Sequence, residues 1–155
     1  MSPSLTVMAE RTQGSISINS DPGTVLDVIA DLESYPQWST SIRAARVLVE
    51  DDLGWADEAE LTIDQPMFKD TYALDYTWDV EEDGSGVVSW SLLRGEVLTV
   101  MDGSYTLTES EPGVTTVVYD LEFDLSIPMP ASIKRKVEQT IIDSALKDLK
   151  ARVES

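Results

Sequence analysis

Tyrosine and carboxylate side chains are the residues of this sequence whose positions could support chemistry. Tyr72, Tyr76 and Tyr105 each share one side of an alternating segment with apolar residues. A buried tyrosine hydroxyl usually has a hydrogen-bond partner, so each of these is either a core residue or a polar contact for a ligand. The chain has no histidine and no cysteine, which excludes Ser-His-Asp and Cys-His catalysis and thiolate metal sites.

Three carboxylates, Asp75, Asp102 and Glu122, alternate with the apolar residues of the predicted strands. We expect them to face solvent, because successive side chains of a strand point to opposite faces of a sheet. A register shift of one residue would turn them into the interior. Burial there would raise the pKa of a carboxyl group and make it a candidate general base.

Four positive residues in the otherwise acidic body of the chain have two interpretations. On the surface they would form ion pairs without a functional role, whereas inside a pocket they would anchor a ligand carboxylate. We favour surface ion pairs for all of them. These residues are Arg43, Arg46, Lys69 and Arg94.

The net charge of the chain is −18, and six of its eleven basic residues lie in the last 26 positions. An acidic surface repels phosphate backbones and anionic lipid headgroups, so we expect no nucleic-acid partner. No apolar run approaches the roughly 18 residues of a membrane-spanning helix, and residues 1–12 lack the features of a secretory signal. We therefore expect a cytoplasmic protein without stable membrane insertion, and the oligomeric state is left open.

The longest helical pattern covers residues 130–153, and the rest of the fold must be arranged around it. Pro130 fits the first turn, where its missing N–H is not needed. A helix of about 36 Å with an apolar stripe requires a wide partner surface, which predicts a large sheet. The stripe falls on one side of a helix of about 3.6 residues per turn and consists of Ile141, Ile142, Ala145, Leu146, Leu149 and Val153.

Alternating apolar and polar residues predict strands in the remainder of the chain. A first strand is expected within residues 8–20, followed by a helix that begins at Pro22 and ends near Glu33. A bend and a short second helical turn should follow, because the residue before a proline disfavours the α region. Six strands joined by hairpin turns lie between residues 42 and 127. These elements predict one α+β domain, residues 1–155, with a seven-stranded antiparallel sheet.

Several segments resemble a known family. Residues 25–51, VLDVIADLESYPQWSTSIRAARVLVED, resemble the helix–helix–strand opening of the polyketide cyclase/dehydrase and lipid-transport proteins. LDYTW (residues 74–78) and DGSYTLTE (residues 102–109) resemble mid-sheet segments of small actinobacterial members, and IPMPASIKRKV resembles the final strand-to-helix junction. The resemblance covers residues 14–153. It implies the START-like helix-grip fold, in which a curved seven-stranded sheet wraps around a long C-terminal helix and two short helices follow the first strand.

The resemblance also implies a deep apolar cavity between the sheet and the C-terminal helix. Trp38 should anchor the short helix against the sheet. No motif carries a defined catalytic set, and we expect no metal and no cofactor. The residues expected to line the cavity are Leu61, Ile63, Tyr72, Tyr76, Trp78, Trp90, Met101, Tyr105, Phe123, Ile133, Val137 and Ile141.

Three functions are compatible with these patterns. The leading hypothesis is binding or transport of a hydrophobic small molecule, such as a lipid, an isoprenoid or a polyketide-like compound. The alternatives are a cyclase or dehydratase that uses cavity tyrosines or aspartates, and a protein-interaction module with a residual cavity. A filled interior, with a cavity well below about 300 Å³, would contradict the hypothesis of a carrier.

Overall fold

A computed structural model describes residues 11–155, which form seven strands and four helical segments. Their order along the chain is the predicted one: a strand, short helices, six strands and a long helix. The elements are β1 (Thr12–Ile18), α2 (Pro22–Ala30), the 3-10 turn η1 (Leu32–Ser34), α3 (Tyr35–Trp38), β2 (Ile42–Glu50), β3 (Ala56–Asp64), β4 (Lys69–Val80), β5 (Gly86–Arg94), β6 (Leu98–Glu111), β7 (Val114–Leu125) and α4 (Ala131–Glu154).

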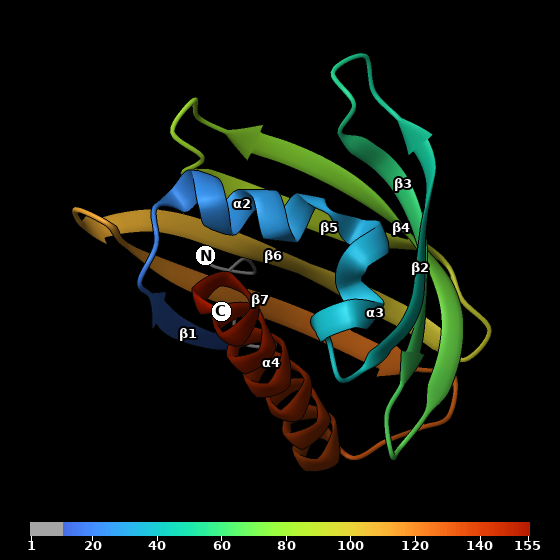
Figure 1. The fold of residues 1–155 in the computed structure, drawn as a ribbon. Helices are drawn as coiled ribbons and strands as arrows, with labels where there is room; N and C mark the ends of the chain where they lie inside the picture. The colour runs from blue at the N-terminus through green and yellow to red at the C-terminus, as the bar shows by residue number, and fades with distance from the viewer. Residues whose placement is uncertain (1–10) are drawn as a thin grey trace, which may run out of the picture.

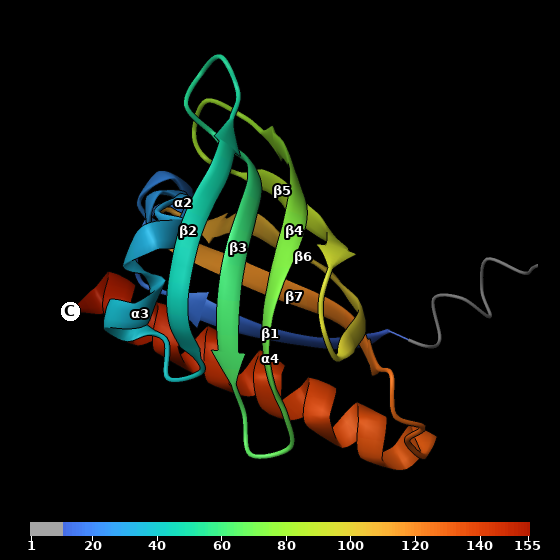
Figure 2. The ribbon, with the colours of Figure 1, turned by 90° about the vertical axis from the view of Figure 1, so that its right-hand side faces the viewer.

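All seven strands form a single antiparallel sheet in the order β1-β7-β6-β5-β4-β3-β2. The strands β2 to β7 are neighbours in sequence order, whereas β1 closes the far edge by pairing with β7. The sheet is strongly curved, and α4 lies across its concave side (Figure 1, Figure 2). The short helices α2 and α3 cover another part of the same side. The α+β helix-grip fold predicted from the sequence is therefore confirmed.

The alternation of apolar and polar residues decides which face of each strand enters the core. In β3 the side chains of Ala59, Leu61 and Ile63 are buried, while the residues between them are partly exposed. The strands β6 and β7 show the same period of two in their burial. Because successive side chains of a strand point to opposite faces, this pattern determines which side chains of each strand face the interior.

The connection between α2 and β2 differs from the prediction. The helix α2 ends at Ala30 rather than near Glu33, and η1 precedes α3. Tyr35 has α-helical angles (φ −51°, ψ −41°) although it precedes a proline, which corrects the expected bend at this residue. The side chain of Tyr35 is buried, and its hydroxyl donates a hydrogen bond to the carbonyl oxygen of Ile29 (2.5 Å). These interactions outweigh the local preference against the α region before proline.

The predicted first and last strands extend beyond β1 (Thr12–Ile18) and β7 (Val114–Leu125). Of the first strand predicted within residues 8–20, residues 8–10 lie outside the described residues. At the other end, Ile127 was expected to continue the last strand, but β7 ends at Leu125 and Ile127 is exposed. The two prolines that follow Ile127 leave the chain without the N–H groups that a longer ladder needs.

The long helix α4 is seated on β1 and β7 at one edge of the sheet. Its stripe buries Ile142 and Leu149 completely. Gly14 in β1 permits this close approach, because a Cβ atom at that position would lie 2.6 Å from Cγ2 of Ile142. The helix therefore covers the β1–β7 side of the concave face, and other side chains must fill the space over the central strands.

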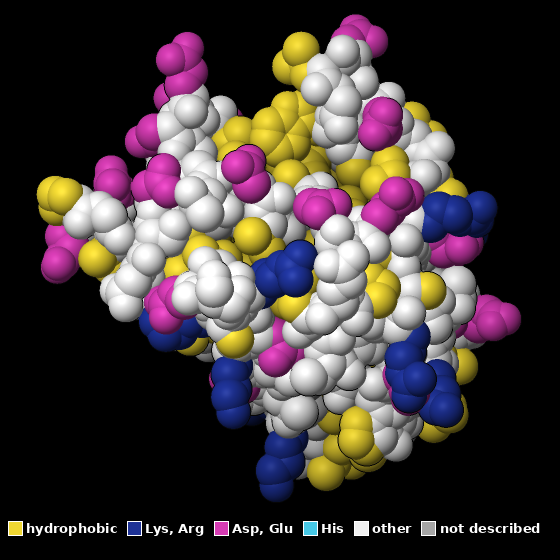
Figure 3. All heavy atoms as spheres, viewed as in Figure 1, with side chains coloured by type: hydrophobic (Ala, Val, Ile, Leu, Met, Phe, Trp, Pro, Cys, Tyr) yellow, Lys and Arg dark blue, Asp and Glu magenta, His cyan; other side chains and the backbone are white. Residues whose placement is uncertain are grey.

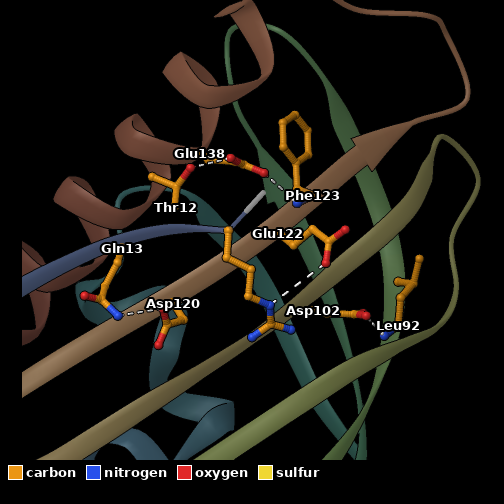
Figure 4. Close-up of polar contacts among 9 residues, drawn as sticks. Thr12, Gln13, Leu92, Asp102, Asp120, Glu122, Phe123 and Glu138 are labelled. Carbon is orange, nitrogen blue, oxygen red and sulfur yellow. Dashed lines mark hydrogen bonds and ion pairs between the residues drawn. The ribbon is translucent and has the colours of Figure 1, made fainter. Parts of the chain in front are cut away.

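One fully buried carboxylate, Glu138, ties α4 to both of these strands (Figure 4). It accepts hydrogen bonds from the hydroxyl of Thr12 in β1 (2.5 Å) and from the backbone N–H of Phe123 in β7 (2.9 Å). A buried carboxylate is tolerated when donors of this kind satisfy it. The pair of bonds sets the position of the helix along the sheet.

We predict that Glu138→Ala lowers the free energy of unfolding by at least about 2 kcal/mol, because it leaves the Phe123 N–H buried without an acceptor and opens a cavity. Urea unfolding followed by circular dichroism measures this change. The matched control is Asp143→Ala, an exposed acid on the same helix, which should change stability by less than about 0.5 kcal/mol. Equal effects of the two substitutions would contradict a structural role for Glu138.

Candidate functional site

A pocket lies between the concave face of the sheet, α3 and α4. Eight of the twelve residues predicted to line a cavity do line it: Leu61, Ile63, Tyr72, Tyr76, Trp90, Met101, Tyr105 and Ile141. The residues that sequence reasoning missed are Ile29, Tyr35, Trp38, Ser39, Ser41, Ile42, Leu74, Tyr119 and Ala145. The strands β3 to β7 therefore supply one wall of the pocket, while α3, the start of β2 and α4 supply the other.

The cavity volume of this pocket is about 80 Å³. Small-molecule sites typically measure about 300–1,000 Å³, and about 80 Å³ is room for two or three water molecules. The expectation of a deep cavity ready for a lipid-sized ligand is therefore wrong for this structure. A ligand larger than a few atoms enters only if part of the wall moves.

Aromatic rings packed in tilted and edge-on pairs are the reason why the interior is so full. The ring of Trp90 lies 5.4 Å from that of Tyr105, 5.7 Å from that of Tyr119 and 6.0 Å from that of Tyr76, between centroids. The rings of Tyr105 and Tyr119 are 4.7 Å apart. Gly103 makes space for the indole, since a Cβ atom there would lie 2.7 Å from a ring carbon of Trp90. These rings fill the concavity that α4 leaves open.

Four tyrosine hydroxyls on this pocket have no hydrogen-bond partner within residues 11–155. They belong to Tyr72, Tyr76, Tyr105 and Tyr119, and each side chain is more than nine-tenths buried. The fifth tyrosine, Tyr35, differs because its hydroxyl donates to the carbonyl oxygen of Ile29. A buried hydroxyl without a partner is unfavourable by roughly 1–3 kcal/mol. The residues that line this small pocket therefore include four buried hydroxyl groups that could donate to a ligand.

Burial raises the pKa of all four of these hydroxyls, and desolvation is the largest cause in each case. Neighbouring tyrosines raise the pKa of Tyr72, Tyr76 and Tyr105 further. Every residue that lines the pocket is uncharged. At neutral pH the site therefore offers neutral O–H groups, which are hydrogen-bond donors and weak acids, rather than a base or a charge.

Four of the predicted lining residues lie elsewhere, which corrects the sequence prediction. Ile133 is 39% exposed near the start of α4, because the apolar stripe only begins to contact the sheet beyond it. Val137 is buried against the core without lining the pocket, and Phe123 packs on the ring of Phe68 (5.6 Å between centroids). Trp78 lines a separate hollow between two turns at the end of the sheet.

The three carboxylates with uncertain facing lie on the outer face of the sheet, as expected. Asp75 is exposed. Asp102 accepts a hydrogen bond from the backbone N–H of Leu92 (3.0 Å), and Glu122 lies 3.9 Å from Arg11 (Figure 4). None of the three lines the tyrosine pocket. The candidate general bases of the sequence analysis are therefore outside the site.

Surface ion pairs account for three of the four positive residues. Arg43 pairs with Asp64 (2.7 Å), Arg46 with Glu60 (3.2 Å), and Lys69 lies 3.9 Å from Asp64. The fourth, Arg94, lines a shallow hollow on the outer face. None of them lines the tyrosine pocket, so none is placed to anchor a ligand carboxylate there.

A buried carboxylate that sequence reasoning missed, Asp70, shapes the turn between β5 and β6. It accepts hydrogen bonds from the backbone N–H groups of Glu96, Val97 and Leu98, at 2.9–3.1 Å. Its partners are all backbone groups 26–28 positions away along the chain, so no local pattern signals its role. Asp70 is a structural residue outside the pocket.

Residues 11–155 contain no group of three or more metal-ligating side chains placed to hold an ion. In the same residues, no helix is long and apolar enough to cross a membrane.

The curved sheet, the gripping helix and the pocket between them define a protein of the helix-grip class. The family described as polyketide cyclase / dehydrase and lipid transport matches residues 18–150, and the chain belongs to this family. The resemblance of residues 14–153 stated from the sequence is thereby confirmed. Comparison with curated protein sequences found no match.

Several solved structures share the fold at low sequence identity. A START superfamily protein from Mycobacterium smegmatis has a TM-score of 0.85 and 19% identity, over 93% of this chain and 97% of that one. A STAR-related lipid transfer protein from Xanthomonas axonopodis has a TM-score of 0.76 and 18% identity, over 94% and 86%. The Zhui aromatase/cyclase from Streptomyces sp. R1128 has a TM-score of 0.73 and 13% identity, over 93% of each chain. At these identities the likeness concerns the fold alone.

The raised pKa values predict how the protein responds to alkali. Each of the five tyrosines has a folded-state pKa above the ordinary value of 10.0. Below about pH 10 the tyrosines are protonated in both the folded and the unfolded chain, so their burial is fully compatible with folding. Above about pH 10 the unfolded chain releases the tyrosine protons before the folded chain does, so the free energy of unfolding falls as pH rises. At about pH 10.5 we expect the folded protein to show no tyrosinate absorbance. The tyrosines should ionise only when the protein unfolds, so this absorbance should appear together with the loss of the circular dichroism signal. Gradual ionisation of the folded protein near pH 10 would contradict the buried cluster.

Proposed function

We propose that this protein binds an uncharged hydrophobic small molecule that carries oxygen atoms, in the pocket of Tyr72, Tyr76, Tyr105 and Tyr119. The single observation that carries the proposal is the set of four buried hydroxyls on an apolar pocket, which have no hydrogen-bond partner among residues 11–155. A carbonyl, ether or hydroxyl oxygen of a ligand would accept hydrogen bonds from them. The aromatic rings would pack against its apolar part.

An uncharged ligand fits the site better than an ionised one. The lining residues provide no opposite charge, and an isolated ion in such surroundings would lose its hydration without compensation. An oxygen atom with lone pairs, by contrast, relieves the unfavourable burial of one or two hydroxyls when it binds. This selects compounds such as phenols, quinones, ketones or polyketide-like molecules over fatty-acid anions.

Entry requires movement of a short segment, residues 38–42, which joins α3 to β2 and forms part of the wall. This segment is held against α4 by what we call the latch, the hydrogen bonds of Thr40 with Ser144 and Asp148. The backbone N–H and the hydroxyl of Thr40 each lie 2.9 Å from a carboxylate oxygen of Asp148, and the hydroxyl is 3.2 Å from that of Ser144. All three contacts are exposed to solvent, so they hold the segment against α4 only weakly. On its other side, Ser41 accepts hydrogen bonds from the backbone N–H of Asp64 (2.8 Å) and from the side-chain amide of Gln65.

Binding is favoured over acid–base catalysis by the same side chains. General acid–base groups work best when their pKa lies near the working pH, whereas burial moves the pKa of these tyrosines further above it. The carboxylates considered as bases lie on the other face of the sheet. A cyclase or dehydratase would therefore have to act by holding its substrate in a reactive shape.

The proposal is tested with a matched pair of aromatic probes, 2-naphthol and naphthalene, in competition with the uncharged dye Nile red. We expect 2-naphthol to bind about three- to tenfold more tightly than naphthalene, as one or two buried hydrogen bonds predict. The measurement is displacement of the dye followed by fluorescence. Equal affinity of the two probes, or no displacement by either, would contradict a pocket that selects oxygen.

A second prediction separates ligand contacts from ordinary packing. Tyr105→Phe and Tyr119→Phe should leave the free energy of unfolding unchanged or higher, because each removes a buried hydroxyl without a partner, while reducing the preference for 2-naphthol. The matched control is Tyr35→Phe, which breaks the bond to the Ile29 carbonyl and should lower stability by about 1 kcal/mol without changing that preference. If Tyr105→Phe destabilises the ligand-free protein as much as Tyr35→Phe does, its hydroxyl is already satisfied and the proposal is wrong.

The latch makes a kinetic prediction. Asp148→Ala removes both contacts with Thr40, so the open segment becomes more populated and the association rate of Nile red should rise about two- to tenfold. Stopped-flow fluorescence measures this rate. Asp143→Ala removes an acid from the same helix, with only a contact to Gln139, and should leave the rate unchanged. An unchanged rate in Asp148→Ala would place the entrance elsewhere.

A further inference from the structure

A second hollow lies between α2 and the turns that join β2 to β3 and β4 to β5, and the ring of its Trp78 stacks on that of Tyr76 in the tyrosine pocket (5.6 Å between centroids). Its volume is about 480 Å³, and it shares no lining residue with the tyrosine pocket. Leu26, Leu53, Trp55, Trp78 and Val80 provide its apolar surface. Figure 3 shows hydrophobic side chains in a depression between the two projecting turns, with acidic side chains around it. We call this site the tryptophan hollow.

Its two indole rings are held in place before any ligand binds. The rings of Trp55 and Trp78 are 4.9 Å apart between centroids, at an angle of 37°. The Nε1–H of Trp78 donates to the carbonyl oxygen of Ala56 (2.7 Å). Asp51 accepts hydrogen bonds from the backbone N–H groups of Leu53 (2.8 Å) and Trp55 (2.9 Å), which fixes the turn. The aromatic walls are therefore preorganised, which reduces the loss of freedom on binding.

The charges around the hollow are all negative. Asp27, Glu81 and Glu82 line it, and no lysine or arginine does. Within residues 11–155 none of these three carboxylates has an ion pair. The chain as a whole carries a net charge of −18, so the field near the hollow attracts cations and repels anions.

Aromatic faces together with unpaired carboxylates are the chemistry that recognises organic cations. A ring attracts a cation through its quadrupole, and tryptophan does so best. The carboxylates add Coulomb attraction, and the aliphatic side chains contact the substituents of the cation. A bare metal ion would use neither the rings nor the leucines.

We propose that the tryptophan hollow binds a small organic cation, an amine or quaternary ammonium with apolar substituents. Its volume lies within the range of about 300–1,000 Å³ of small-molecule sites, in contrast to the tyrosine pocket. The two sites have opposite preferences: the tyrosine pocket selects an uncharged oxygen-bearing compound, and the hollow selects a positive charge. The second site does not depend on the first.

The test compares choline with its uncharged isostere 3,3-dimethylbutan-1-ol, followed through the four indole N–H signals of the protein by nuclear magnetic resonance. Trp→Phe variants assign these signals. Choline should shift the signals of Trp55 and Trp78 and leave those of Trp38 and Trp90 in place, and the isostere should bind at least about threefold more weakly. Equal shifts with both compounds, or shifts confined to Trp38 and Trp90, would overturn the proposal.

Charge variants keep the test independent of folding. The double variant Glu81→Gln, Glu82→Gln lies on an exposed turn and should weaken choline binding about three- to tenfold. The matched control, Glu109→Gln with Glu111→Gln, removes two acids next to the β6–β7 turn, outside the hollow, and should change binding less than twofold. An equal loss in both double variants would show a general effect of net charge and overturn a site built by these residues. Added salt should weaken binding in the wild type, and binding that does not respond to salt would also overturn it.

Discussion

The contact between α4 and the first two strands at one side of the sheet, the edge strand β1 and its neighbour β7, determines how the interior of this protein is used. Gly14 lets Ile142 approach the backbone of β1, and Glu138 holds both strands through hydrogen bonds from Thr12 and Phe123. A helix seated so close to one edge cannot also cover the centre of a curved sheet. Over β3 to β6, α4 contributes only Ile141 and Ala145 to the wall of the pocket, so other side chains must fill most of this space.

Aromatic rings fill this space. Trp90 fits because Gly103 has no side chain, and the tyrosines pack around the indole. The rings fill the volume that a ligand would need, so the cavity is only about 80 Å³. Their hydroxyls have no hydrogen-bond partner among the described residues. The rings therefore fill the space well, but their polar groups are left unsatisfied. A ligand with oxygen atoms would satisfy them, once the exposed contacts of Thr40 with α4 break and let segment 38–42 move.

The arrangement of strands and helices could be predicted from the sequence because it depends on local periodicity. A period of two in β4, β6 and β7 fixed the inward side of Tyr72, Tyr76 and Tyr105, and the outward side of Asp75, Asp102 and Glu122. The same alternation, Val117, Tyr119, Leu121, would have identified Tyr119 as well. The family resemblance implied that a pocket lies between the sheet and the C-terminal helix. The pocket residues on β4, β6 and β7 then follow from which side of each strand faces the interior.

What could not be predicted depends on contacts between distant parts of the chain. The volume of the pocket follows from how four rings, those of Tyr76, Trp90, Tyr105 and Tyr119, pack together, which no single segment encodes. Trp38, Ser39 and Ser41 reach the pocket because α3 folds back over the sheet, and Tyr35 is helical because of a hydrogen bond that overrides the effect of the following proline. Ile133 was expected to line the cavity, but it is exposed because α4 contacts the sheet only beyond it. The burial of Asp70 and Glu138 depends on backbone N–H groups of distant residues, which no local pattern indicates.

Native mass spectrometry of the protein isolated from the cells that naturally produce it tests the central claim most directly. The account predicts a folded protein that carries one additional small mass, released as an uncharged, oxygen-containing compound on unfolding, and lost when Tyr72, Tyr76, Tyr105 and Tyr119 are all replaced by phenylalanine in a folded variant. The same bound mass in that variant, or only the mass of the polypeptide in the wild type, would contradict it.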